Sequence, residues 1–314
     1  MCIRDSPGTL IGESLLEDLI ASKRQVLIVF DEVHHVVASQ PDQIISRALA
    51  AAERSGTKVQ FLGLTATETR PDLRSVLAYF NHHITYEKSA ANLTARGFLV
   101  PFTYHAGDEW LHPKNQVPTC ILPNDERATE RRDLLLSPAA FPQIVNALDT
   151  HVRDREDRKT LIVAPSVHLA GELRSHLNTN DDYKGRVVRL TAEDRDTDPV
   201  RFKDTYEAWK KGRWPEGSPF AHEPVPEIVV AVDLFKEGAD APAVQTIINW
   251  ADTNSLIVFL QTLGRGLRPS PFKTNLTVVD ICGTFRKAHL LQYLGNASDP
   301  RNEQSQTDAD RDKE

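Results

Sequence analysis

The sequence predicts an α/β protein built from parallel sheets with helices beside them. Short apolar runs rich in valine, isoleucine and leucine recur along its 314 residues, and segments with a helical spacing of apolar residues lie between the runs. Such runs are typical of strands that are buried on both faces of a parallel sheet. Because strand and helix alternate, we expect the α/β class. The 40% hydrophobic content is sufficient for a core in each of two compact units.

Seven apolar runs are the expected strands. They are Val26 to Phe30, Val59 to Leu64, Thr160 to Ala164, Arg186 to Leu190, Ile228 to Val232, Gln245 to Trp250 and Leu276 to Cys282. Three segments carry apolar residues three or four positions apart and are the clearest helices: Leu15 to Ile20, Ile44 to Leu49 and Leu169 to Leu177.

The alternation of strand and helix lapses after Pro101, where prolines and charges break the pattern. A second irregular stretch, Gly212 to Pro226, is expected to be a surface loop. The end of the chain has almost no large apolar residues, which is typical of a disordered tail. These breaks predict a partial first domain over 1–100, a connector over 101–135, a second domain over 136–290 and a disordered acidic tail over 291–314.

Composition excludes several classes of protein. The chain has no run of roughly 20 apolar residues, so we expect no membrane-spanning helix, and with no secretion signal at its start we expect a cytoplasmic protein. Cys2, Cys120 and Cys282 lie far apart, which argues against a zinc site and a disulfide framework. The net charge of −7 indicates that any contact with nucleic acid is local.

The first expected strand ends abruptly in Asp31-Glu32-Val33-His34-His35. In open α/β sheets, ligands bind outside the carboxyl ends of the strands. In phosphoryl transfer, one carboxylate holds magnesium and a second group acts on the attacking water. Asp31 and Glu32 suit these two roles. For an acidic pair alone, a simple acidic turn after a strand is the favoured alternative.

Further motifs follow in order. Gly63-Leu64-Thr65-Ala66-Thr67 closes the next strand, and Ala231 to Asp240 and Gln261 to Arg268 come later in the chain. On a helix, Arg265 and Arg268 would point to one side and could reach a phosphate together. The alternative is a solvated basic helix end. Gly264 and Gly266, on either side of Arg265, favour close approach to a neighbour, because glycine is otherwise a poor helix former.

These motifs together resemble superfamily 2 helicases. Asp31-Glu32-Val33-His34 resembles their D-E-x-H Walker B element, Thr65-Ala66-Thr67 their S/T-A-T motif III, and Gln261 to Arg268 their Q-x-x-G-R-x-x-R motif VI. Weaker similarities are those of Ser6 to Leu10 with motif Ib, Leu161 to Ser166 with motif IV, and Val232 to Asp240 with motif V. The resemblance covers about Ser6 to Arg286. With Arg96 to Pro101, it is closest to the bacterial DEAD/DEAH-box-like branch related to restriction-enzyme motor subunits.

The resemblance implies an ATP-dependent DNA helicase or translocase with two RecA-like domains, the first incomplete. ATP and Mg²⁺ are the implied cofactors. DNA is the implied partner, with RNA as the alternative and with restriction or defence-complex subunits as further partners. In such a protein ATP lies between the domains, and hydrolysis moves the protein along the strand.

The resemblance also implies roles for single residues. Asp31 would hold magnesium through water, Glu32 would act on the hydrolytic water, and Arg265 and Arg268 would reach the γ-phosphate, with Arg268 as the arginine finger. His34 and Gln261 would couple the two domains across the cleft, and Gly238 and Asp240 would lie near the ribose and the domain interface. Thr65 and Thr67 would couple the nucleotide pocket to the neighbouring domain. The residues that would bind strand phosphates are Gly8, Thr9, Ser166 and Thr191.

One expected motif is missing: the sequence contains no G-x-x-x-x-G-K-[ST], the loop that holds the β- and γ-phosphates. Because the chain starts at motif Ib, we expect that the segment with this loop has been cut away and that Met1 to Asp5 is a foreign leader. The chain alone would then bind ATP poorly and hydrolyse it negligibly, and its first sheet would have exposed apolar faces. Alternatives are a non-hydrolysing nucleic-acid-binding scaffold, an RNA-directed helicase and a nucleotide-binding signalling protein.

Overall fold

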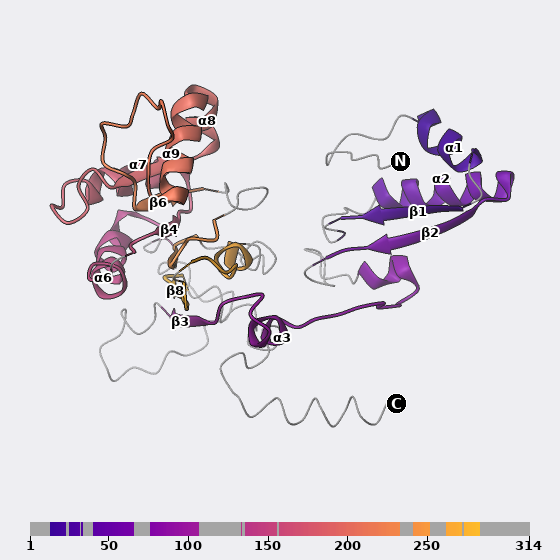
Figure 1. Ribbon diagram of the computed structural model, residues 1–314, viewed down its shortest axis with the longest axis horizontal. Coiled ribbons are helices and arrows are strands. Elements are labelled where there is room, and N and C mark those ends of the chain that lie inside the picture. Colours follow the sequence, from indigo (N-terminus) through magenta and orange to yellow (C-terminus); the bar gives the residue numbers. More distant parts are fainter. Residues whose placement is uncertain are drawn as a thin grey trace, which may run out of the picture. The chain divides into compact units, whose positions relative to one another are not determined.

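The structure is a computed structural model that divides the chain into two compact units, 1–87 and 88–314. It describes residues 13–22, 25–31, 33, 40–65, 76–106, 133, 136–155, 157–232, 241–251, 262–271 and 273–282. Figure 1 shows the helices and strands of each unit. The two units are described separately below.

The first unit is a pair of parallel strands with helices on one face. Its elements are α1 (Glu13–Ala21), β1 (Gln25–Phe30), α2 (Gln40–Ser55), β2 (Lys58–Gly63) and the 3-10 helix η2 (Val76–Phe80). The register of β1 and β2 runs from Gln25 opposite Lys58 to Phe30 opposite Gly63. The core between helices and strands contains Leu16, Ile20, Ala48 and Ala51, with Val26, Ile28, Val59 and Phe61 packed against them.

The opposite face of β1 is exposed. Exposed and half-buried residues alternate along the strand, and the side chains of Leu27 and Val29 are 57% and 48% exposed. The expectation that this strand is buried on both faces is therefore wrong, because no described element covers the second face. The expectation of an exposed apolar face on the first sheet agrees with the structure.

The second unit has a six-stranded sheet in the order β3-β8-β7-β4-β6-β5, and all its strand pairs are parallel. Its strands are β3 (Phe102–Ala106), β4 (Thr160–Val163), β5 (Val187–Leu190), β6 (Ile228–Ala231), β7 (Thr246–Asn249) and β8 (Leu276–Asp280). Its helices are α3 (Ala90–Ala95), η3 (Pro138–Ala140), α6 (Phe141–His151), α7 (Val167–Leu177), α8 (Ala192–Thr197) and α9 (Pro199–Lys211).

The core of the second unit lies on both faces of this sheet. Every residue of β6, β7 and β8 is buried, as expected for central strands of a parallel sheet. Residues of one face pack around Ile144, Leu173 and Trp250. Residues of the other face pack around Trp209 and Leu263. The two indoles are therefore core side chains.

All seven strands expected from the sequence are present, to within one or two residues at each end. The three expected helices correspond to α1, α2 and α7. Residues 212–226 contain turns and bends but no helix or strand, as expected for a loop. No helix within the described ranges has the length and apolar character needed to cross a membrane.

One element was missed, and it changes the predicted connector. Residues 102–106 form β3, an edge strand that pairs with β8, so the expected connector over 101–135 does not begin where predicted. The strand alternates apolar and polar residues, Phe-Thr-Tyr-His-Ala, and lacks the continuous apolar run of a central strand. The unit boundary also lies earlier than expected, because Val100 N–H donates to Leu267 O at 2.8 Å and Leu276 N–H donates to Pro101 O at 2.9 Å. The predicted tail and the rest of the connector, apart from Asp133, lie outside the described residues.

Two glycines near Arg265 provide a test of the packing. A Cβ atom added at Gly266 would lie 2.8 Å from Ile247 Cδ1 and 3.0 Å from Leu276 Cδ2, whereas one at Gly264 would meet nothing within 4 Å. We predict that Gly266→Ala lowers the free energy of unfolding by roughly 1–2 kcal/mol, because the buried neighbours must move. Gly264→Ala should leave it unchanged or raise it by up to about 1 kcal/mol.

Denaturant unfolding of the two alanine variants measures this difference. Equal stability of both variants would show that the segment around Gly266 does not pack against β7 and β8 in solution.

Candidate active site

The predicted metal-binding carboxylate lies at the carboxyl end of β1. Asp31 directly follows the strand and is exposed. Leu64 N–H donates to Phe30 O at 2.8 Å, and Val33 N–H donates in turn to Leu64 O at 2.9 Å. Val33 is 3% exposed, so its side chain anchors the turn that follows Asp31. These bonds keep Asp31 and Thr65 at the same edge of the strand pair.

This edge presents a carboxylate and a hydroxyl group. Oxygen atoms of this kind are the ligands that Mg²⁺ prefers, and Mg²⁺ keeps several of its waters when it binds. Among the described residues, no three potential metal ligands lie together. The residues present therefore fit Mg²⁺ only through a single carboxylate, which would bind the cation through water. Glu32, His34 and Thr67, predicted for the same edge, lie outside the described residues.

The predicted arginines lie in the second unit on a short helical segment, here called the arginine helix (residues 262–267). Residues 262–266 are helical, and Leu267 N–H still donates to Leu263 O at 2.9 Å. Leu263 and Leu267 are buried in the core. Arg265 is half-buried, and Arg268 is exposed in the bend that follows. Gln261 lies outside the described residues.

The sequence placed both arginines on one side of a continuous helix, and the structure differs. Helical hydrogen bonding ends at Leu267, so the direction of Arg268 is set by the bend. The close approach that the glycines predicted holds for Gly266 against β7 and β8 and does not hold for Gly264. The remaining predicted nucleotide contacts, Gly238 and Asp240, lie outside the described residues.

Two carbonyl groups at the end of the arginine helix have partners that the sequence did not predict. Val100 N–H donates to Leu267 O at 2.8 Å, and Lys273 Nζ donates to Gly266 O. Lys273 is buried, with 7% of its surface exposed, and its Nζ also donates to Pro242 O at 3.0 Å. Burial lowers the pKa of Lys273 to about 8, against an opposing effect of the Asp157 carboxylate. A single lysine after a proline-rich turn carries no recognisable sequence signal.

The two described residues predicted to bind strand phosphates are both helix caps. Ser166 Oγ accepts a hydrogen bond from Leu169 N–H at 3.2 Å at the start of α7, and Ser166 remains half-buried. Thr191 is 0% exposed. Its hydroxyl donates to Asp194 Oδ2 at 2.6 Å and accepts from Asp194 N–H at 3.3 Å, which is a capping box at α8.

Thr191 is therefore corrected from a phosphate-binding to a structural residue. Both hydrogen-bonding roles of its hydroxyl are used inside the fold, and the group is closed to solvent. The other two predicted phosphate-binding residues, Gly8 and Thr9, lie outside the described residues.

A buried carboxylate at the carboxyl edge of the second sheet was also missed. Asp280, the last residue of β8, is 0% exposed. It accepts hydrogen bonds from Tyr104 Oη at 2.9 Å and from Asn249 Nδ2 at 3.1 Å. These bonds join the carboxyl end of β8 to the carboxyl end of β7 and to the middle of β3. An aspartate that ends an apolar strand is the same signal that identified Asp31, so the sequence could have indicated this position.

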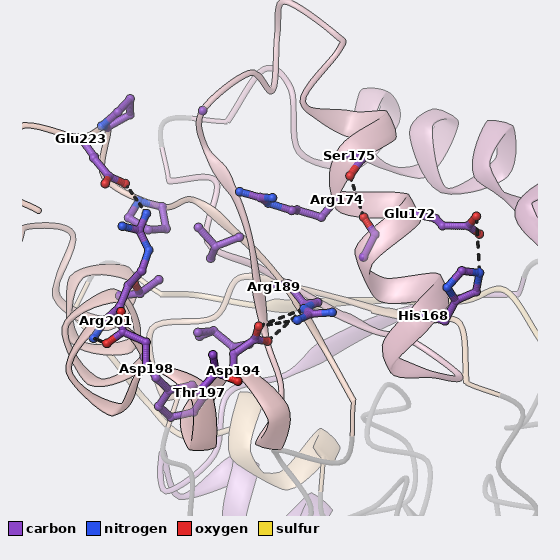
Figure 2. Close-up of a pocket in the computed structure, with 18 of the residues that line it drawn as sticks. His168, Glu172, Arg174, Ser175, Arg189, Asp194, Thr197, Asp198, Arg201 and Glu223 are labelled. Carbon is purple, nitrogen blue, oxygen red and sulfur yellow. Dashed lines mark hydrogen bonds and ion pairs between the residues drawn. The ribbon is translucent and has the colours of Figure 1, made fainter.

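A cavity of about 900 Å³ lies beside β5, the strand at the opposite side of the second sheet from β3 (Figure 2). Its walls come from α7, β5, α8, α9 and the loop over 212–226. Two of its guanidinium groups are already paired: Arg189 with Asp194 at 2.6 Å, and Arg201 with Glu223 at 2.7 Å. Figure 2 shows Arg174 extending from α7 into the cavity. None of the predicted site residues lines this cavity, so its chemistry is separate from that of Asp31 and Arg268.

No protein-family model matches the chain. Among curated proteins, it is 24% identical over 267 residues to a Saccharomyces cerevisiae protein with the provisional name ATP-dependent helicase IRC3. The match covers 82% of this chain and 34% of that protein, so the chain spans about a third of this relative's length.

Two solved structures share the fold. A fragment provisionally named as the HsdR subunit of a type I restriction enzyme from Vibrio vulnificus matches with a TM-score of 0.59 and 20% identity, over 91% of this chain and 48% of that one. The ATP-dependent Type ISP restriction-modification enzyme LlaBIII, solved bound to DNA, matches with a TM-score of 0.53 and 11% identity, over 85% of this chain and 20% of that one.

The predicted α/β fold with parallel, helix-flanked sheets is confirmed, and the two restriction-enzyme structures share it. Together with the order of motifs, the similarity to the yeast relative supports a relationship to the superfamily 2 helicases, and the fold is shared with restriction-enzyme subunits.

Proposed function

We propose that this chain is the motor part of an ATP-dependent DNA helicase or translocase, which couples ATP hydrolysis to movement along nucleic acid. The observation that carries the proposal is the position of Asp31, an exposed carboxylate held at the carboxyl end of a parallel strand beside Thr65. Ligands of open α/β sheets bind at this edge. The relationship to superfamily 2 helicases supports the same assignment.

Among the acidic residues, Asp31 would hold Mg²⁺ through water, and Glu32 would orient and deprotonate the water that attacks the γ-phosphate. The cation, when bound, neutralises charge on the phosphate oxygens. Thr65 and Thr67 pass the state of the nucleotide to the rest of the protein through their hydroxyl groups. The buried Val33 supports these roles, because it anchors the turn that follows Asp31.

On the basic side, Arg265 and Arg268 bind the γ-phosphate, and Arg268 stabilises the charge of the transition state. The exposure of Arg268 in a bend, directly after a helix anchored in the core, supports this assignment. Gln261 and His34 couple nucleotide state to movement, while Gly238 and Asp240 lie near the ribose. These last four assignments rest on the sequence motifs alone.

Nucleic acid is bound without reading its sequence, through backbone amides and small hydroxyls at helix starts. Ser166 at the start of α7 is the described member of this set, with Gly8 and Thr9 as members by motif. DNA is the proposed strand, since the LlaBIII enzyme with the same fold was solved bound to DNA. RNA is the alternative, and restriction or defence-complex subunits are the proposed protein partners.

The chain has no P-loop sequence, and we propose that by itself it hydrolyses ATP negligibly. We predict no DNA-stimulated ATP turnover for the chain alone. A version with a P-loop segment added before Ser6 should hydrolyse ATP when single-stranded or duplex DNA is present. In that version Glu32→Gln should lower kcat by about 10²- to 10⁴-fold, the usual contribution of a general base.

A phosphate-release assay with single-stranded DNA, duplex DNA and RNA measures this prediction. DNA-stimulated activity of the chain alone that is abolished by Glu32→Gln would contradict the proposed need for a P-loop. A P-loop version without turnover on any nucleic acid would favour the non-hydrolysing scaffold.

The two helix caps form a matched pair for the proposed strand contacts. Ser166→Ala and Thr191→Ala should each lower the free energy of unfolding by about 0.5–2 kcal/mol, because each removes an N-cap. Only Ser166→Ala should weaken DNA binding, by about threefold to tenfold, which corresponds to one lost hydrogen bond.

Fluorescence anisotropy with a labelled oligonucleotide at fixed salt measures the affinity, and denaturant unfolding measures the caps. If both variants weaken DNA binding equally, Thr191 also contacts the strand, and its correction to a structural residue is wrong. No weakening by Ser166→Ala would remove Ser166 from it.

A further inference from the structure

Lys273 is a buried lysine whose ammonium group binds backbone rather than a carboxylate. It lies between the arginine helix and β8, and 7% of its surface is exposed. Its Nζ donates to Gly266 O and, at 3.0 Å, to Pro242 O. Burial of a cation is costly unless its donors are matched. Two carbonyl groups provide that match here.

Both carbonyl groups lie beside segments that the proposed reaction uses. Gly266 stands between Arg265 and Arg268 and is the last helical residue of its segment. Pro242 comes two residues after Asp240, the proposed contact near the ribose. The ammonium group of Lys273 therefore joins the backbone of the arginine helix to the backbone that follows the motif V segment (Val232 to Asp240).

The end of the arginine helix needs such a partner. The last carbonyl groups of a helix have no partner within it, and a cation is favourable at the negative end of the helix dipole. Lys273 binds the Gly266 carbonyl, and Val100 N–H binds the Leu267 carbonyl. Gly266 also packs against β7 and β8. The backbone between the two arginines is thus held both by hydrogen bonds to its carbonyl groups and by apolar packing of Gly266.

We infer that Lys273 is a positioning residue of the proposed ATPase, which binds the Gly266 and Pro242 carbonyls and thereby fixes the backbone from which Arg265 and Arg268 reach phosphate. The inference rests on the proposed function. A guanidinium group acts on a transition state only when it is aligned, and a displacement of about 1 Å can cost 10²-fold in rate. Lys273 itself does not touch the substrate.

The protonation of Lys273 gives this role a distinctive pH dependence. Burial lowers its pKa from 10.5 to about 8, and Asp157, the charged group that acts on it among the described residues, opposes the shift. Below this pKa the ammonium forms charge-assisted bonds to both carbonyls, and above it the neutral amine binds them more weakly. The arginine segment should therefore loosen as the pH rises through the pKa of Lys273.

Over the pH range in which the arginine segment loosens, the contribution of Lys273 to the free energy of unfolding should increase. In the unfolded chain Lys273 keeps its proton up to its ordinary pKa of 10.5, so between about 8 and 10.5 the unfolded state binds more protons than the folded state. The contribution of Lys273 to the free energy of unfolding then rises with pH. A loss of kcat in this range thus cannot come from unfolding caused by Lys273.

The first test uses the ATPase of the version that carries a P-loop. Lys273→Met keeps the length of the side chain and removes its charge and its donors, and it should lower kcat by about tenfold or more with KM for ATP unchanged. Lys273→Arg should recover part of the lost kcat, since it restores a charged donor. Wild-type kcat should fall between about pH 7 and pH 9, and this fall should be absent in Lys273→Met.

Lys159→Met is the matched control. Lys159 Nζ donates to Lys210 O at 3.3 Å, at the end of α9, so this lysine also caps a helix that carries neither arginine. Its replacement should leave kcat and the pH profile unchanged. An equal loss of kcat in Lys159→Met, or a Lys273→Met variant with the wild-type kcat, would overturn the inference.

The second test uses the chain itself and needs no ATPase activity. Nitrogen-15 relaxation of the Arg265 and Arg268 Nε–H groups should show greater motion in Lys273→Met than in Lys159→Met. In the wild-type chain, the same motion should increase between about pH 7 and pH 9. If Lys273→Met does not fold, the wild-type titration alone decides. Unchanged motion through this range would overturn the inference.

The two tests separate the inference from the proposed function. A P-loop version without ATPase activity, together with the expected change in arginine motion, would reject the proposed function and leave Lys273 as the residue that orders the arginine segment. Normal ATPase activity with unchanged arginine motion would do the reverse.

Discussion

Parallel strand pairing is the constraint on which the rest of the structure depends. When all strands of a sheet run in one direction, their carboxyl ends meet at one edge, and residues far apart in the sequence become neighbours there. In the first unit this edge brings Asp31 beside Thr65 through the bonds that join Phe30, Leu64 and Val33. In the second unit it brings Asn249 and Asp280 together, and Tyr104 donates to Asp280 from the middle of β3. The fold thus gathers polar groups at one edge of each sheet.

Apolar runs predicted the central strands well because burial on both faces favours apolar residues at most positions. Ile228–Ala231 and Leu276–Asp280 are buried at every position. The edge strand Phe102–Ala106 was missed because an edge strand has one partner and tolerates Thr103 and His105. The apolar run of β1 alone did not indicate its exposed face, since Leu27 and Val29 are as apolar as any core residue; that face was expected only from the missing P-loop segment.

The site shows the same division between signals that a short motif carries and contacts that only the fold creates. Asp31 was predictable because a carboxylate directly after an apolar strand is a local pattern. Lys273 was not, because its partners at Pro242 and Gly266 are brought to it by tertiary structure. Thr191 misled for a third reason, since a hydroxyl at a helix start has the same sequence whether it caps the helix or binds a phosphate.

We propose that Asp31, Glu32, Arg265 and Arg268 serve one phosphoryl transfer. A double-variant analysis tests it most directly, with single-turnover ATP hydrolysis measured for Glu32→Gln, Arg268→Ala and the combination in the version with a P-loop. Groups that act as a unit in one step are strongly non-additive. The double variant should therefore be no slower than the slower single variant. Losses that multiply, or a single variant that keeps the wild-type rate, would contradict it.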